Sequence, residues 1–378
     1  MDKKAVSEIR RLMTVNNYRI DKIRGCYVDE DRQIVTELHE TFLAMEEATV
    51  EKYCEIFRQT LGGKPGKNLF NLEFPLEEEA PGGRQELLYR LEKSGLADDS
   101  LVRAFCDRVI ETAAFPEKYL ILLAHGVYDV PGRTSDGIDM EDASDYVYSF
   151  ILCSLCPVTL VKEGLCYDSE KKIFLDRRSD WAVQRPSAGF LFPAFNDRGP
   201  DIHQTLFFAR RPDELHEEIP AELLGCPMPL PEEDQRDAFK NVVESALGRD
   251  CDFENVKNIH EAIGQLVEQE KDSGEPVQIE KAQLRRILSD NGATRESLET
   301  FDDAFEEAVG EGGALMAENA ADTNRLEIKT PSLRITVKAE MADMIRTRFI
   351  DGIEYLTIPV ADDIEVNGIR ILQSRRKS

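Results

Sequence analysis

Apolar residues follow two different spacings along this chain, and each spacing predicts one kind of element. At 48–61 they recur every three or four residues, which is typical of an amphipathic helix, and we predict another helix at 35–46. The segments 18–29, 145–162 and 164–175 are rich in aromatic and β-branched residues, which favour strands. The first part of the chain therefore mixes helices and strands.

The stretch 181–211 holds the one tryptophan of the chain and two apolar runs with a polar turn between them. Neither run alternates between apolar and polar residues, which indicates strands buried on both faces. The link from Asn196 to Asp201 contains the Asn, Asp, Gly and Pro residues that specify turns. We expect a hairpin or tight corner here, with Asp201 and His203 on one face of the second strand because side chains alternate.

After the proline-rich segment 227–234, the pattern predicts helices, a short strand at 277–279, further helices, and two strands at 324–329 and 333–338. This is the order of elements in a winged helix-turn-helix. The helix in the place of a recognition helix, 294–309, carries one arginine against six acidic residues. That charge disfavours contact between this helix and DNA.

These elements predict an α/β or α+β fold in three parts. Residues 1–229 would form an N-terminal α/β domain with a mixed sheet, and residues 230–318 a helical segment. Residues 319–378 would form a small C-terminal β-hairpin unit, and the winged-helix-like order of elements would extend over residues 253–338. With 378 residues, of which 42% are hydrophobic, the chain can build more than one core.

The chain is acidic, with a formal net charge of −26. Such a charge repels nucleic acid unless basic residues are segregated onto one face. No apolar run approaches about 20 residues, and the start lacks the apolar core of a signal peptide, so we expect neither membrane insertion nor export. The eight dispersed cysteines fit reduced thiols in the cytoplasm. Cys153 and Cys156 would point to opposite faces of a strand, which disfavours shared ligation of a metal.

Basic residues are least outnumbered at the C-terminus, where residues 325–378 contain ten basic and eight acidic side chains. We expect this surface to be the one most available to nucleic acid. Further arginines surround Trp181, where they could stack on bases or pair with phosphates; a network of arginines and carboxylates around a buried Trp is the competing interpretation. The candidate contacts are Arg177, Arg178, Trp181, Arg185, Arg346, Arg348, Arg375, Arg376 and Lys377.

Two hypotheses of different class follow. The favoured one is a non-enzymatic cytoplasmic protein, with no expected cofactor, that binds nucleic acid or a nucleoid-associated partner. The alternative is a hydrolase with a divalent metal at Asp197, Asp201 and His203, aided by His125 and Asp129, because imidazole and carboxylate two residues apart on a strand can share a cation. In the structural interpretation, Asp197 caps the turn and His203 is hydrogen-bonded at the end of the sheet. The sequence predicts no oligomeric state.

Several longer strings carry a resemblance to a known family. They include GCYVD, GKNLFNLEF, YLILLAHGVYDVPGRTSD, GFLFPAFNDRGPDIH and IEVNGI. Over nearly its whole length the chain resembles a bacterial family catalogued only as a domain of unknown function, and this resemblance implies no activity. The layout, with an α/β first half, a helical middle and C-terminal hairpins, is also similar to that of bacterial nucleoid-associated proteins. This second likeness rests on layout alone and implies a chromosome-associated role without assigning any residue to it.

Overall fold

The computed structural model describes residues 1–113, 115–133, 139–169, 171–177, 179–270, 277–310, 313–322, 325–359, 364–366 and 369–371. They form two compact units: the N-terminal unit, Met1–Glu232, and the C-terminal unit, which comprises the described residues from Glu233 onward. The further division that the sequence predicts at residue 319 stays a prediction. No helix in the described ranges has the length and apolar content that a bilayer span requires.

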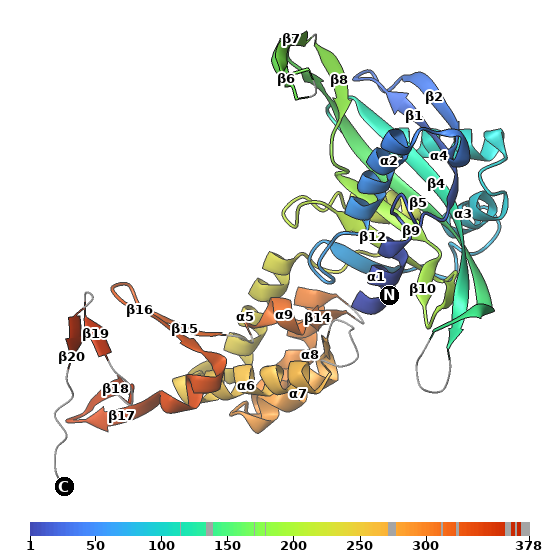
Figure 1. The fold of residues 1–378 in the computed structure, drawn as a ribbon. Coiled ribbons are helices and arrows are strands. Elements are labelled where there is room, and N and C mark those ends of the chain that lie inside the picture. The colour runs from blue at the N-terminus through green and yellow to red at the C-terminus, as the bar shows by residue number, and fades with distance from the viewer. Residues whose placement is uncertain are drawn as a thin grey trace. The chain divides into compact units, whose positions relative to one another are not determined.

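One large sheet organises the N-terminal unit (Figure 1). Its strands lie in the order β2-β1-β4-β5-β9-β12-β3, and β8 pairs separately with β5. Every strand pair in it is antiparallel, where the sequence predicted a mixed sheet. Neighbours such as β1 and β2 are joined by a short connection, whereas a parallel pair needs a long crossover. The strands are β1 (Ile20–Val28), β2 (Ile34–Thr41), β3 (Leu69–Glu73), β4 (Tyr119–Arg133), β5 (Asp139–Val161), β8 (Asp180–Val183), β9 (Ala188–Phe192) and β12 (Gln204–Ala209).

Helices cover both faces of this sheet, so its central strands are buried on both sides (Figure 1). Phe105 and Phe190 belong to the core on the face of α3 and α4, and Phe57 belongs to the core on the face of α1 and α2. Each such side chain stabilises the fold by roughly 1.5–3 kcal/mol. Cys153 lies in the first core and Cys156 in the second, which confirms that they point to opposite faces. The helices are α1 (Lys3–Arg11), α2 (Glu47–Thr60), α3 (Arg84–Lys93), α4 (Asp99–Thr112) and the π-helix η2 (Ile219–Leu224).

The helix predicted at 35–46 is wrong. Residues Ile34–Thr41 form the edge strand β2, and a single 3₁₀ turn, η1 (Phe42–Ala44), follows it. The leucine and glutamate residues of this segment favour a helix in isolation. Backbone pairing with β1 overrides that preference, because strand formation depends on the neighbouring strand more than on local propensity.

The turn predicted between Asn196 and Asp201 is confirmed as a small hairpin. Its strands β10 (Ala194–Asn196) and β11 (Gly199–Asp201) pair with each other, outside the main sheet. The sequence predicted that Asp201 and His203 lie on one face of a strand. This is wrong, because β12 begins only at Gln204 and His203 lies in the turn before it. A second hairpin outside the main sheet is formed by β6 (Gly164–Asp168) and β7 (Ile173–Arg177).

Among the described residues, the C-terminal unit has a helical core followed by three hairpins (Figure 1). Phe301 and Phe305 of α8 are fully buried in that core. The helices are α5 (Glu232–Leu247), η3 (Gly248–Asp250), α6 (Phe253–Gln269), α7 (Lys281–Asp290), α8 (Arg295–Val309), α9 (Ala317–Ala320) and η4 (Ala339–Met344). The strands are β13 (Gln278–Glu280), β14 (Ala314–Met316), β15 (Arg325–Lys329), β16 (Arg334–Lys338), β17 (Arg346–Ile350), β18 (Ile353–Thr357), β19 (Ile364–Val366) and β20 (Ile369–Ile371).

The predicted order of helices and strands is interrupted by β14 and α9, which lie between α8 and β15, and the strand pairing also differs from a winged helix. The short strand β13 pairs with β14, which the sequence analysis did not predict. The strands β15 and β16 pair only with each other among the described residues and so stand apart from β13. Within the described ranges, the hairpin β15–β16 is therefore not a wing that strand pairing attaches to the helical core.

Candidate nucleic-acid interface

The hairpin β15–β16 has one basic face and one apolar face. Arg325 pairs with Lys338, and Lys329 pairs with Arg334, so these four side chains share one face with Glu327. All five are exposed. The alternate positions are half-buried and apolar; they are Leu326, Ile328, Ile335 and Val337. In a chain of net charge −26, this ribbon gathers four cations around one acid.

Both basic pairs on this face are directly opposite each other, which is unfavourable for the hairpin alone. Like charges in cross-strand pairs destabilise a sheet by about 0.2–1 kcal/mol per pair. The Nε of Arg325 lies 3.1 Å from a carboxylate oxygen of Asp322, and Arg334 pairs with Glu327. In the described part of the chain, Lys329 and Lys338 form no ion pair. The face therefore keeps uncompensated positive charge at two exposed ammonium groups.

The hairpin β17–β18 adds a second basic face that also carries an aromatic ring. Arg348 pairs with Tyr355, and Arg346 lies on the same face two residues earlier. All three side chains are exposed. Guanidinium and phenol groups side by side on one face of a ribbon can pair with phosphate and contact a base or sugar.

The start of β17 is tied to the helical core of its unit. The backbone N–H of Thr347 donates to a carboxylate oxygen of Glu254 at 3.3 Å. Lys257, which is only 6% exposed, lies 3.1 Å from Glu254 and 3.6 Å from Asp343. Burial works to raise the pKa of Glu254, but Lys257, the Thr347 N–H and Arg346 together hold that pKa below its ordinary value. The carboxylate therefore stays ionised and fixes the hairpin end to α6.

Sequence reasoning identified Arg346 and Arg348 but missed the four basic residues of β15–β16. Their signal is the strict alternation in RLEIK (325–329) and RITVK (334–338), which puts every charge on one side of a strand. What the alternation could not supply is the register. Only the pairing of the two strands brings both charged sides onto one face.

The surroundings of Trp181 include a cation that the sequence analysis did not identify. The indole is 49% exposed rather than buried, and the ammonium of Lys118 lies 4.1 Å from its ring centroid, a cation–π contact that the sequence did not predict. Arg185 is exposed, and Arg177 ends β7. The remaining candidates lie outside the described residues; they are Arg178, Arg375, Arg376 and Lys377.

The turn proposed as a metal site is held together by direct hydrogen bonds. Asn196 donates to a carboxylate oxygen of Asp201 at 2.8 Å, and the other Asp201 oxygen accepts the backbone N–H of His203 at 3.0 Å. The ring of His203 lies 2.6 Å from Glu79, and this carboxylate raises the pKa of the imidazole above its ordinary value. Asp197 occupies a left-handed turn position, with φ of 48°. A positively charged His203 is a poor metal ligand.

His125 and Asp129 do not join that turn. Both lie on β4, and the turn contacts that strand at Pro131, whose carbonyl oxygen accepts from Arg198 at 2.7 Å. Asp129 is exposed, while His125 has hydrogen-bond partners of its own, Asp21 and Ser149. No group of three or more His, Cys, Asp or Glu side chains in the described ranges is arranged to hold a metal ion. The metal-hydrolase hypothesis stays a prediction for which the described residues assemble no ligand set.

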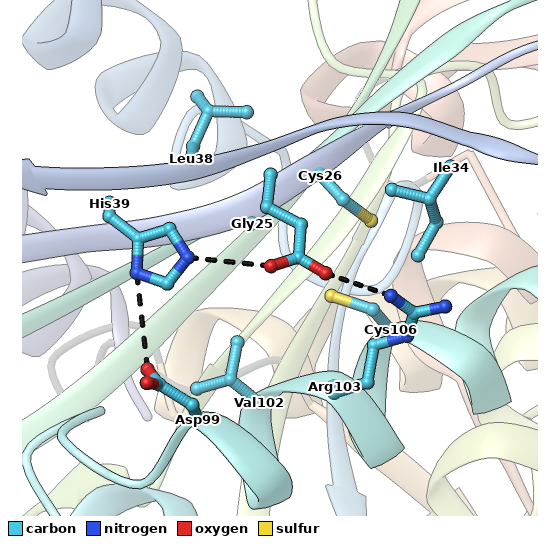
Figure 2. Close-up of a pocket in the computed structure, with 10 residues that line it drawn as sticks. Gly25, Cys26, Ile34, Leu38, His39, Asp99, Val102, Arg103 and Cys106 are labelled. Atoms are coloured by element: carbon cyan, nitrogen blue, oxygen red, sulfur yellow. Dashed lines mark hydrogen bonds and ion pairs between the residues drawn. The ribbon is translucent and has the colours of Figure 1, made fainter.

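A pocket beside β1, β2 and α4 gathers further polar groups (Figure 2). Glu37 lies 2.8 Å from Arg103 and 3.5 Å from His39, whose other ring nitrogen is 3.9 Å from Asp99. Cys106 also lines the pocket; a hydrogen bond with a neighbouring thiol, and burial, raise its pKa. A thiol that stays protonated is a poor nucleophile. The charged groups of this pocket thus pair with one another.

Comparison with protein families gives a match over nearly the whole chain. The model of a family described as Domain of unknown function (DUF4317) matches residues 1–369. No curated protein matched the chain.

Proposed function

We propose that this chain, which belongs to the DUF4317 family, binds the phosphate backbone of duplex nucleic acid through the hairpins β15–β16 and β17–β18. The observation that carries the proposal is the pair of like-charged cross-strand contacts, Arg325 with Lys338 and Lys329 with Arg334. A polyanion lying over this face would turn their repulsion into attraction. We also propose a cytoplasmic location, because the eight cysteines are dispersed along the sequence as reduced thiols of cytoplasmic proteins commonly are.

The shape of the hairpins supports the same partner. A two-stranded ribbon fits the major groove of B-form DNA, and several DNA-binding proteins insert such ribbons into a groove. On β17–β18, Arg346 and Arg348 would contact phosphates, and Tyr355 would contact sugar or base edges. The acidic remainder of the protein would be repelled by the same phosphates, so binding would be confined to the two ribbons.

The affinity for nucleic acid should fall with salt concentration at a rate set by the number of phosphate contacts. Each basic side chain that neutralises one phosphate contributes about −0.9 to the slope of log K against log salt concentration. Six such side chains lie on the two basic faces: Arg325, Lys329, Arg334, Lys338, Arg346 and Arg348. If all six contact phosphates, the slope is about −5.

The test measures binding of the full chain to a fluorescently labelled duplex of about 30 base pairs, by anisotropy, at salt concentrations between about 50 and 200 mM. The double variant Lys329→Gln, Lys338→Gln should weaken binding and reduce the magnitude of the slope by about two. Both lysines are exposed and form no ion pair among the described residues, so their replacement leaves no partner uncompensated.

The matched control removes the same charge from elsewhere in the same unit. Lys240 on α5 and Arg249 in η3 are exposed and lie outside both hairpins. The variant Lys240→Gln, Arg249→Gln should keep the slope of the unaltered protein. Binding that is absent, insensitive to salt, or weakened equally by both double variants would overturn the proposal.

A further inference from the structure

Three side chains from adjacent strands of the main sheet form a continuous hydrogen-bonded chain. A carboxylate oxygen of Asp21 lies 2.7 Å from Nδ1 of His125, and Nε2 of the same ring lies 3.1 Å from Oγ of Ser149. The strands that carry them, β1, β4 and β5, are neighbours in the sheet, so backbone pairing fixes their order. The imidazole thus has a carboxylate on one nitrogen and a hydroxyl on the other.

An irregularity in β1 brings Asp21 into this chain. Ile20 pairs with Gly126, and Lys22 pairs with His125, which leaves Asp21 as an extra residue without a register partner. Such a β-bulge redirects one side chain while the ladder continues on both sides of it. The sequence contains no obvious sign of this bulge, which explains why Asp21 was not among the predicted site residues.

The surroundings hold the imidazole in one orientation. His125 is only 6% exposed, and Gly95, at the end of α3, is packed beside its ring. Lys22 donates to the carbonyl oxygen of Gly95 at 3.2 Å, and Arg24 donates to that of Leu96 at 3.2 Å. Hydrogen bonds from two side chains of β1 therefore hold the segment after α3 next to His125.

Asp21 is ionised in this arrangement. Burial works to raise the pKa of its carboxyl group, but the hydrogen bond from His125, together with backbone N–H groups, holds that pKa below its ordinary value. An ionised carboxylate at Nδ1 favours the tautomer that carries its proton there. Nε2 is then free to accept the proton of the Ser149 hydroxyl.

We propose that Ser149 is a nucleophile with His125 as its general base and Asp21 as the group that positions the base. The order carboxylate, Nδ1, Nε2, hydroxyl is the one that activates serine in hydrolases of several unrelated folds. The substrate class is a carboxylic ester with an apolar acyl group. This site lies in the N-terminal unit and is independent of nucleic-acid binding by the hairpins.

The acyl preference follows from the neighbours of the hydroxyl. Val127 is the register partner of Ser149, and Val147 lies on the same face two residues before it. These valines are 38% and 59% exposed, respectively, while Ser149 is half-buried. An apolar acyl chain lying along them would remove both from water while its carbonyl carbon reached the hydroxyl.

The reaction balances without an added oxidant or reductant. Oγ of Ser149 bonds to the ester carbonyl carbon as its proton moves to Nε2 of His125. The bond between that carbon and the alkoxy oxygen then breaks, and the alcohol leaves with the proton. Water attacks the acyl-serine by the same sequence, its proton passing through Nε2 to Oγ, so that a carboxylic acid leaves and the hydroxyl is restored.

The test uses a fluorophosphonate probe, which phosphonylates an activated serine: an Oγ–P bond forms, the P–F bond breaks, and fluoride leaves. The full-length protein is treated with the probe, digested, and read by mass spectrometry. Ser149 should carry the label. Ser100, an exposed serine whose hydroxyl donates to Asp98, is the internal control and should stay unlabelled.

Two variants distinguish activation of Ser149 by His125 and Asp21 from a purely structural role of these two residues. His125→Gln should slow labelling at least about 100-fold, the usual contribution of a general base. Because that buried substitution can unfold the protein, Asp21→Asn is the second variant; its side chain is 47% exposed, and labelling should slow at least about tenfold while the thermal melt still shows a folded protein. Labelling of Ser149 no faster than Ser100, or unchanged in folded Asp21→Asn, would overturn the proposal.

Discussion

Lys329 and Arg334 face each other directly across the first pair of positions beside the β15–β16 turn. Arg334 also pairs with Glu327, but Lys329 forms no ion pair within the described residues. The two cations therefore repel each other at a place where many other pairs would strengthen the hairpin. A hairpin that keeps this arrangement is less stable alone than it could be, and an anion over the face would relieve the cost.

Replacing one of these cations by an acid should stabilise the protein and weaken binding at the same time. Lys329→Glu converts the repulsion with Arg334 into an attraction, so we expect the free energy of unfolding to rise by about 0.2–1 kcal/mol. Calorimetry measures that change, and anisotropy with the labelled duplex measures the loss of affinity. The neutral variant Lys329→Gln should show a smaller gain in stability. A loss of stability in both variants would show that the pair is not repulsive.

The two side chains on β17–β18 should contribute to binding in different ways. Arg348→Gln removes a phosphate contact and should reduce the magnitude of the salt slope by about one. Tyr355→Ala removes a contact with sugar or base edges, which carries no charge, and should weaken binding without changing that slope. Titrations at several salt concentrations distinguish the two effects. Equal slopes for Arg348→Gln and the unaltered protein would remove Arg348 from the interface.

The contact between His203 and Glu79 should stabilise the protein only while the imidazole is protonated. The carboxylate raises the pKa of His203 above its ordinary 6.5. The stabilisation is therefore complete below pH 6.5 and is lost as the pH rises through the folded-state pKa. Glu79→Gln should bring the imidazole pKa back toward its ordinary value, which an NMR titration of the ring protons can follow. An unchanged titration in Glu79→Gln would contradict the assignment.

Glycine at position 25 should be essential to the main sheet. The backbone of Gly25 has φ of +151°, and a Cβ built there would lie 1.9 Å from the carbonyl oxygen of Ile121 on β4. Gly25→Ala therefore forces β1 and β4 apart, and we expect a loss of about 3 kcal/mol or more in urea unfolding. Gly164→Ala is the control, because no atom lies within 4 Å of its Cβ position, and it should change stability little.

The C-terminal elements could be predicted well because their signals are local. The predicted helix at 294–309 is observed as Arg295–Val309, and the predicted strands at 324–329 and 333–338 as Arg325–Lys329 and Arg334–Lys338. Apolar spacing, an N-cap threonine at Thr294 and a four-residue turn define these elements within a few neighbouring positions. By contrast, the segment 35–46 was predicted wrongly, because the pairing of β2 with β1 lies outside any local window.

The candidate sites also combine local features that the sequence determined with contacts between distant segments that it did not. Sequence alone determined that basic and apolar residues alternate along 325–329 and 334–338, since a side chain's face on a strand follows from its position. It could not determine that Lys329 meets Arg334, because the register of two strands is a relation between separate segments. The chain Asp21, His125 and Ser149 depended even more on tertiary structure. A bulge and the pairing of three strands bring together residues up to 128 positions apart, and no spacing along the sequence encodes that contact.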